Sequence, residues 1–114
     1  MTDYHPLGTL QKRVMSTLWS ATEPLTIHVI HAKLNKEKGH PDLAYTTILT
    51  VCRNLTKHKY IDQIKGERNH KFVALVTQEW YQDAACVNFV DDVFNGDVVK
   101  ACSAIAKAFN ERGR

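Results

Sequence analysis

Apolar residues recur at steps of three and four along most of this chain, which is the spacing of one face of a helix. Leu10, Val14 and Leu18 are the first such series, and they predict a helix over residues 10–20. Pro24 lies just beyond its end, where a residue that cannot continue a helix is expected. The chain therefore begins with an amphipathic helix followed by a turn.

A second helix is predicted over residues 27–35, with Thr26 as the residue whose side chain caps its N-terminus. A polar loop containing Gly39 and Pro41 follows it.

The third predicted helix lies within residues 43–57 and has two unlike faces. Its apolar stripe consists of Ile48, Val51, Cys52 and Leu55, and its other face carries Thr46, Thr47, Thr50, Arg53, Asn54 and Lys57. Threonine is a poor helix former, and the stretch contains no acidic residue, so helix stability does not explain this composition. Hydroxyl, amide and cationic side chains suit contact with a polyanion, in which threonine meets either phosphate or base.

Two β-prone runs, residues 61–64 and 71–76, flank a polar loop containing Gly66 and predict a hairpin. Three helices followed by a hairpin is the order of a winged helix, in which the hairpin is the wing. Arg68 and Lys71 on the wing, like Lys57 at the end of the third helix, are interpreted as contacts to DNA phosphates. The predicted class is mainly α with a small β-hairpin.

Two more amphipathic helices are predicted after Thr77, separated by a left-handed turn at Gly96. Neither helix can bury its apolar face alone, so we expect them to pair with a second copy or with each other. The predicted dimerisation residues are Trp80, Val87, Phe94, Val98, Ile105 and Phe109. The expected division is a DNA-binding domain over residues 1–76 and a dimerisation segment over residues 77–114.

The charge is distributed unevenly along the 114 residues. Residues 1–76 contain 11 Lys or Arg against 6 Asp or Glu, whereas residues 77–114 contain 4 against 6. The sequence has no secretion signal and no apolar run long enough to cross a bilayer, so a cytoplasmic location without membrane insertion is expected. No nucleophile motif, phosphate loop or metal-ligand spacing is visible, and His28 and His31 lack further ligands. We therefore expect no enzymatic activity, no cofactor and no metal.

The motif Ala44-Tyr45-Thr46-Thr47, joined to Leu18-Trp19 in the first helix and Lys71-Phe72 in the wing, resembles the penicillinase repressor family. The resemblance implies a homodimeric repressor that binds a pseudo-palindromic operator and controls β-lactam resistance or a related stress response. It places Tyr45 among the DNA-binding residues. It also implies that a membrane sensor protease cleaves an Asn-Phe bond, which here would be Asn88-Phe89.

Three residues depart from the family's pattern. Asn54 replaces the usual Arg, Lys59 the usual Gly, and Cys52 a larger aliphatic residue. Because an amide is shorter than a guanidinium, Asn54 predicts a changed operator sequence or affinity.

Two alternatives remain open. The same fold serves in protein-interaction modules without a specific DNA target, which the modest net charge of +3 would suit. The other alternative is a repressor that responds to metal or redox state through Cys86 and Cys102. These thiols lack the neighbouring cysteines of copper-responsive relatives.

Overall fold

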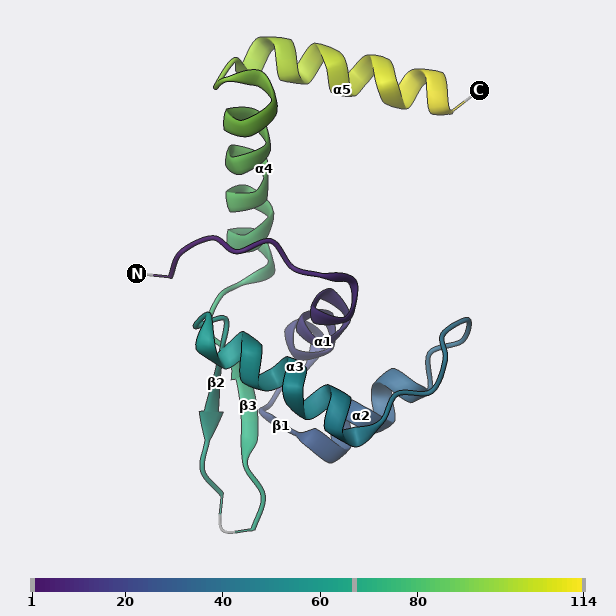
Figure 1. Ribbon diagram of the computed structural model, residues 1–114, viewed down its shortest axis with the longest axis vertical. Coiled ribbons are helices and arrows are strands. Elements are labelled where there is room, and N and C mark those ends of the chain that lie inside the picture. Colours follow the sequence, from purple (N-terminus) through teal and green to yellow (C-terminus); the bar gives the residue numbers. More distant parts are fainter. Residues whose placement is uncertain (1, 67, 114) are drawn as a thin grey trace. The chain divides into compact units, whose positions relative to one another are not determined.

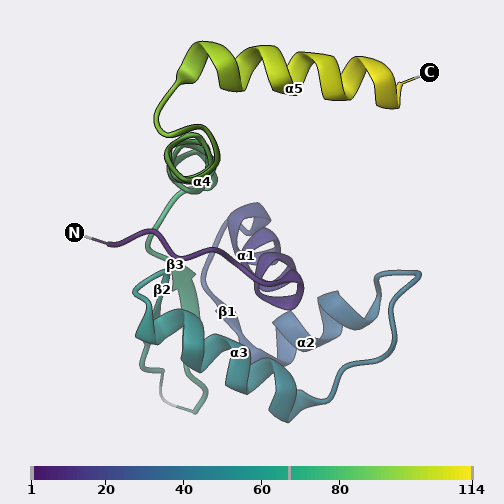
Figure 2. The same cartoon turned by 45° about the horizontal axis from the view of Figure 1, so that its top comes forward.

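The computed structural model describes residues 2–66 and 68–113. The chain divides into two compact units, Met1–Gln78 and Glu79–Arg114, and each is described here by itself. Figures 1 and 2 show the elements of both.

Three helices form the body of the first unit: α1 (Thr9–Ser20), α2 (Ile27–Asn35) and α3 (Tyr45–Lys57). The first two boundaries confirm the predictions to within one residue, and the Thr26 side chain caps α2 by accepting from the Val29 amide at 3.3 Å. The third helix begins at Tyr45, two residues after the start of the predicted stretch. All three pack against one another.

Their predicted apolar stripes meet in one core. The core side chains from the three helices are Val14, Met15, Leu18, Ile27, Ile30, Leu34, Ile48, Cys52 and Leu55. Each is at most 6% exposed, so the stripe predicted on α3 is buried, with Val51 at its edge. Burial raises the pKa of the Cys52 thiol to about 12, since the core disfavours a thiolate.

The sheet has three antiparallel strands in the order β1-β3-β2, namely β1 (Leu25–Thr26), β3 (Lys71–Ala74) and β2 (Ile61–Ile64). The hairpin of β2 and β3 confirms the predicted wing, although β3 ends two residues earlier than expected. Strand β1 was not predicted, because two residues after a proline carry no periodicity. Its pairing of Leu25 with Phe72 is a tertiary contact.

A left-handed residue ends α3 and turns the chain into β2. The Tyr60 amide donates to the Leu55 carbonyl and the Lys59 amide to that of Thr56, both at 3.0 Å, which is the hydrogen-bond pattern of a Schellman motif. Lys59 is the left-handed residue of this motif, with φ of 64°. The family's usual glycine at this position therefore has a physical reason, and lysine adopts the same conformation here.

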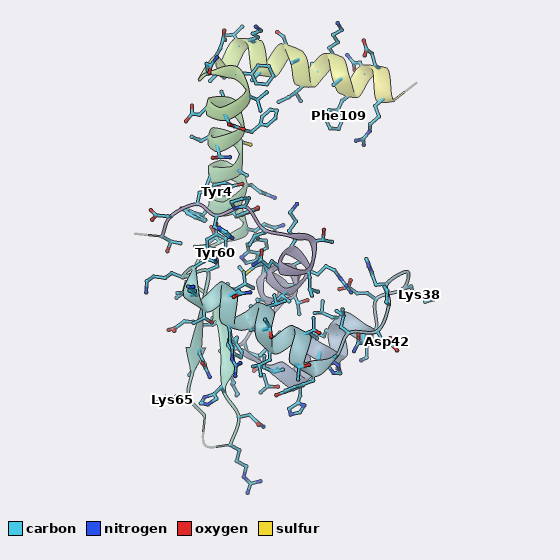
Figure 3. All side chains as sticks on the ribbon, viewed as in Figure 1. Tyr4, Lys38, Asp42, Tyr60, Lys65 and Phe109 are labelled. Carbon is cyan, nitrogen blue, oxygen red and sulfur yellow. The ribbon has the colours of Figure 1, made fainter. Side chains whose placement is uncertain are left out.

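The buried ring of Tyr60 fastens the N-terminal segment to the unit (Figure 3). Its hydroxyl accepts from the His5 amide at 2.6 Å and donates to the His5 carbonyl at 2.8 Å. The His5 ring then stacks on His58 at 3.7 Å between centroids. Desolvation, and next the nearby His5 and Lys57 charges, lower the pKa of His58.

The second unit consists of most of α4 (Gln78–Phe94) and all of α5 (Val98–Arg112). Gly96 adopts the predicted left-handed conformation, and Asn95 before it does so as well. Asp97 then caps α5 by accepting from the Lys100 amide at 3.0 Å. Helix α5 leads away from α4 instead of folding back along it, so the two form no helical hairpin (Figures 1 and 2).

The part of the chain that the structure describes was also searched for membrane spans. None of its helices combines the length and the apolar character that crossing a bilayer requires.

Candidate nucleic-acid interface

Helix α3 presents a polar face directly opposite its buried stripe. At 3.6 residues per turn, Thr46, Thr50, Arg53 and Lys57 fall within a sector of about 60°. All four are exposed. They form a row along the helix that can enter a groove together, and we call these four residues the α3 row.

The other predicted residues of α3 lie on its two flanks. By the same helical geometry, Thr47 and Asn54 lie on one side of the row, and Tyr45 lies on the other. Thr47 and Asn54 are exposed, and Tyr45 is 39% exposed. The sequence alone treated these residues as one set, whereas the fold separates a central row from its edges.

The hydroxyl of Thr50 is already engaged within the helix. It donates to the Thr46 carbonyl at 3.0 Å, one turn earlier. Since a hydroxyl has a single proton, Thr50 can offer an incoming ligand only its methyl group and its oxygen lone pairs. Thr50 therefore suits contact with an apolar group, such as the methyl of thymine, better than donation to phosphate.

The wing supplies the predicted cations. Arg68 and Lys71 are both exposed, as is Lys65 on the other arm of the hairpin (Figure 3). Gly66 is required in this loop because a Cβ there would collide with the backbone carbonyl of Asn69. The described part of the hairpin therefore carries three exposed cationic side chains, Lys65, Arg68 and Lys71.

A side-chain clamp fixes the chain just before α3. Asn35 accepts from the Leu43 amide at 2.8 Å and donates back to the Leu43 carbonyl at 3.2 Å. The Nε2 atom of His31 lies 2.8 Å from the same carbonyl. In the tautomer that carries its proton on Nε2, His31 donates to this carbonyl as well. The clamp holds the start of α3 at a set position against α2.

His31 and the three cysteines lie in different surroundings. His31 is committed to the clamp, and residues 2–66 and 68–113 contain no group of three metal-ligating side chains. Cys52 lies in the core, while Cys86 and Cys102 are exposed on the second unit.

The second unit carries large apolar side chains on its surface. Val87, Val98 and Phe109 are 62%, 60% and 58% exposed, and Ile105 is 43% exposed. The two aromatic residues of the predicted dimerisation set that lie on α4, Trp80 and Phe94, are half-buried. A face with this much exposed hydrocarbon is typical of a surface that another protein covers.

Sequence reasoning selected Tyr45 and Arg68 but not His28 and His70, which lie around the same small hollow beside α3. His28, Arg68 and His70 line this hollow together with Tyr45. The signal was absent from the sequence because about forty residues separate His28 from the other two basic residues.

The sequence profile of a family described as penicillinase repressor matches residues 7–111. Over 66 residues the chain is 42% identical to the transcriptional regulator BlaI of Mycobacterium tuberculosis, in strains CDC 1551 and H37Rv alike. This match covers 58% of the chain and 46% of the relative, so the chain spans about half the length of the curated relatives it matches.

Solved structures share the fold at low sequence identity. The solution structure of the DNA-binding domain of the repressor BlaI superposes with a TM-score of 0.59 at 17% identity, covering 71% of this chain and 94% of that one. A MarR/EmrR family transcriptional regulator from Acinetobacter sp. ADP1 gives 0.52 at 17% identity, covering 93% and 75%. These likenesses confirm the winged-helix architecture.

Proposed function

Because this chain belongs to the penicillinase repressor family, we propose that it is a dimeric transcriptional repressor whose α3 row reads a pseudo-palindromic operator. The observation that carries the proposal is the α3 row itself, an exposed hydroxyl and cationic surface on a helix whose opposite face is fully buried. Family membership also agrees with the expectation that the chain is not an enzyme.

In the proposed complex each part of the first unit has its own task. The α3 row enters the major groove, with Thr47, Asn54 and Tyr45 at its edges. The wing residues Arg68 and Lys71 contact the flanking phosphates, which position the protein without reading sequence. Occupation of the operator then excludes RNA polymerase, and repression follows.

Dimerisation is proposed to take place through the apolar surface of α4 and α5. Val87, Val98, Ile105 and Phe109 supply its exposed part, with Trp80 and Phe94 half-buried beside them. A second copy of the chain has the same exposed hydrocarbon and is therefore a self-complementary occupant. Two linked recognition helices bind two half-sites with much higher affinity than either alone.

Release of the operator by cleavage at Asn88-Phe89 belongs to the same proposal. Both residues are exposed, and Phe89 is 42% exposed. The bond nevertheless lies within α4, so a membrane sensor protease would require the helix to open locally before it could cut. Local opening of α4 is therefore a second step, besides the protease itself, at which cleavage can be controlled. Control of β-lactam resistance is the regulated process that the family description supports best.

The test is fluorescence anisotropy with duplexes from the chain's own upstream region, a scrambled control and a salt series. The Thr46→Ala/Thr50→Ala variant should lose at least about tenfold in operator affinity, because it removes contacts to base edges. Its circular dichroism spectrum and dimer mass should match the wild type. Thr22→Ala, at an exposed site outside α3, is the control and should bind normally.

The alternatives predict different results in the same experiment. A repressor shows sequence-selective binding with a steep negative salt slope. Equal, weak binding to both duplexes would favour the protein-interaction module. Selective binding that oxidant or metal abolishes in the wild type, but not in Cys86→Ser, would favour the redox- or metal-responsive repressor.

A further inference from the structure

A hollow of about 130 Å³ lies where the first turns of α2 and α3 meet the wing. His28 on α2, Tyr45 on α3, and Arg68 and His70 on the wing bring basic and hydroxyl groups to it from three separate elements. The His28 ring lies 5.0 Å from that of Tyr45, measured between centroids. The buried side chain of Phe72, which is 3% exposed, also lines the hollow.

The lining suits an anion. Arg68 is a permanent cation, the two imidazoles can each acquire a proton, and Asn69 and Gln63 add amides that can donate. None of the described lining residues is a carboxylate. Helices α2 and α3 begin at Ile27 and Tyr45, and the partial positive charge of each helix N-terminus also favours an anion.

The size and place of the hollow indicate which anion. Its volume of about 130 Å³ accommodates a single phosphate group. Tyr45 directly precedes Thr46 of the α3 row, and Arg68 belongs to the wing. A DNA strand that runs between the α3 row and the wing therefore passes over this hollow.

We propose that this hollow holds one backbone phosphate of the bound DNA, and that His28 and His70 make operator binding stronger as the pH falls. The proposal rests on the operator-binding function and adds to it a dependence on proton concentration. The titratable lining consists of His28, Tyr45, Arg68 and His70, and of these only histidine ordinarily changes charge between about pH 8 and 5.

The sign follows from linkage. A phosphate stabilises the protonated imidazole, so the complex binds more protons than the free protein and DNA together, and affinity rises as protons are added. Each proton taken up contributes at most about tenfold per pH unit. Arg68 keeps its charge throughout and supplies the part of the contact that does not depend on pH.

The experiment measures operator affinity by fluorescence anisotropy from pH 6.0 to 8.0 at constant ionic strength. We expect the wild type to bind at least about tenfold more tightly at pH 6.0 than at pH 8.0. The His28→Gln/His70→Gln variant should lose most of this difference, so that its own affinities at pH 6.0 and pH 8.0 lie close together. His40→Gln, on the exposed loop between α2 and α3, is the matched control and should keep the full difference.

Two further arms identify the source of the phosphate. Replacing operator phosphates one at a time by neutral methylphosphonates should abolish the pH difference at one position in each half-site. Replacing chloride by inorganic phosphate in the buffer should not selectively weaken operator binding by the wild type. Selective competition by inorganic phosphate, with no sensitive methylphosphonate position, would overturn the DNA assignment in favour of a free-anion site.

The outcomes separate this proposal from the function it rests on. Absence of selective duplex binding at every pH would overturn both. Selective binding whose pH dependence is the same in the wild type and the double variant would overturn the proposal for His28 and His70 alone. Circular dichroism of each variant at both pH limits verifies that the fold is intact.

Discussion

At the scale of single residues, hydrogen bonds inside the fold decide what each side chain can still offer to a ligand. Thr50 has given its proton to the Thr46 carbonyl, and His31 and Asn35 are engaged with Leu43. Lys59 is held at positive φ by the turn that follows α3. Thr17 and Thr56, like Thr50, donate to the carbonyl one turn earlier, of Arg13 and Cys52 respectively.

The role of Thr50 can be tested by separating its methyl from its hydroxyl. Thr50→Ser removes the methyl and should weaken operator binding by about 1 kcal/mol, or about fivefold, the value of one buried methyl group. Thr50→Val keeps the shape and should bind nearly as the wild type. The control is anisotropy with a duplex that carries deoxyuridine in place of thymine and so lacks the thymine methyl. The serine variant should bind this duplex no more weakly than it binds the thymine duplex. A larger loss for valine than for serine would contradict the assignment.

Lys59 marks a place where the protein can be stabilised. Lys59→Gly relieves a left-handed conformation that costs a side-chain-bearing residue about 1–2 kcal/mol, offset in part by the greater freedom of glycine when unfolded. Urea unfolding should therefore show a gain of up to about 1 kcal/mol. Lys57→Gly, within α3 itself, should destabilise by about 1 kcal/mol and serves as the comparison.

The three cysteines should differ in reactivity. Burial raises the pKa of Cys52 to about 12 from 9.0, so the stability it contributes is complete below pH 9 and is lost as the pH rises towards 12. Iodoacetamide at pH 8 should label the exposed Cys86 and Cys102 and leave Cys52 unmodified until the protein unfolds. Peptide mass spectrometry with and without urea gives the answer, and early labelling of Cys52 would mean that the core opens readily.

At the scale of elements, α3 depends on its neighbours for its position. The Asn35 and His31 side chains hold its approach, and Tyr60 closes its end through the N-terminal segment. Helix propensity alone would not select its threonine-rich sequence. Packing of Ile48, Cys52 and Leu55 in the core is what makes the helix stable enough to present its polar face.

Loss of the clamp should loosen α3 without unfolding the first unit. Asn35→Ala leaves the Leu43 amide without its partner and should cost about 1–3 kcal/mol of stability. Operator affinity should fall as well, because the start of α3 is no longer held. Asn54→Ala, an exposed asparagine on the flank, is the control for stability and should change it by less than about 0.5 kcal/mol. Equal effects of the two substitutions on unfolding would contradict the clamp.

At the scale of the whole molecule, the chain combines a unit with its own core and a unit with exposed hydrocarbon. The first unit encloses nearly all of the fully buried side chains, and Ala101 is the buried residue of α5. The apolar side chains of α4 and α5 are the ones that a second copy is proposed to cover. Folding of the first unit should therefore be independent of the second unit, whereas operator affinity should depend on both.

Ending the chain after Gln78 tests this separation. The shortened protein should keep the spectrum of a folded winged helix and sediment as a monomer, because its core lies within residues 1–78. Its operator affinity should fall by at least about 100-fold, since two tethered contacts become independent. Ile105→Asp/Phe109→Asp in the full chain should reproduce both the monomeric mass and the loss of affinity. A dimeric shortened chain would place the interface elsewhere.

The sequence by itself determined the three helices, the hairpin, the cap at Thr26 and the turn at Gly96. These features follow from periodicity and from the local chemistry of capping and turn residues, which act over a few positions. It also indicated the polar face of α3 as a whole, because three threonines without an acidic neighbour are unusual on a surface helix. The division of α3 into an apolar face of four residues and a polar face of six could be read directly from the spacing of its apolar residues.

Only the tertiary structure decided which of these residues cooperate. Strand β1, the clamp on Leu43, the hold of Tyr60 on His5 and the hollow between His28 and His70 all join positions that are distant in sequence. Such contacts have no periodic signature, because they depend on how packed elements bring separate segments together. The chain's local pattern therefore specifies its elements, and the packing of those elements specifies the surface that is proposed to meet DNA.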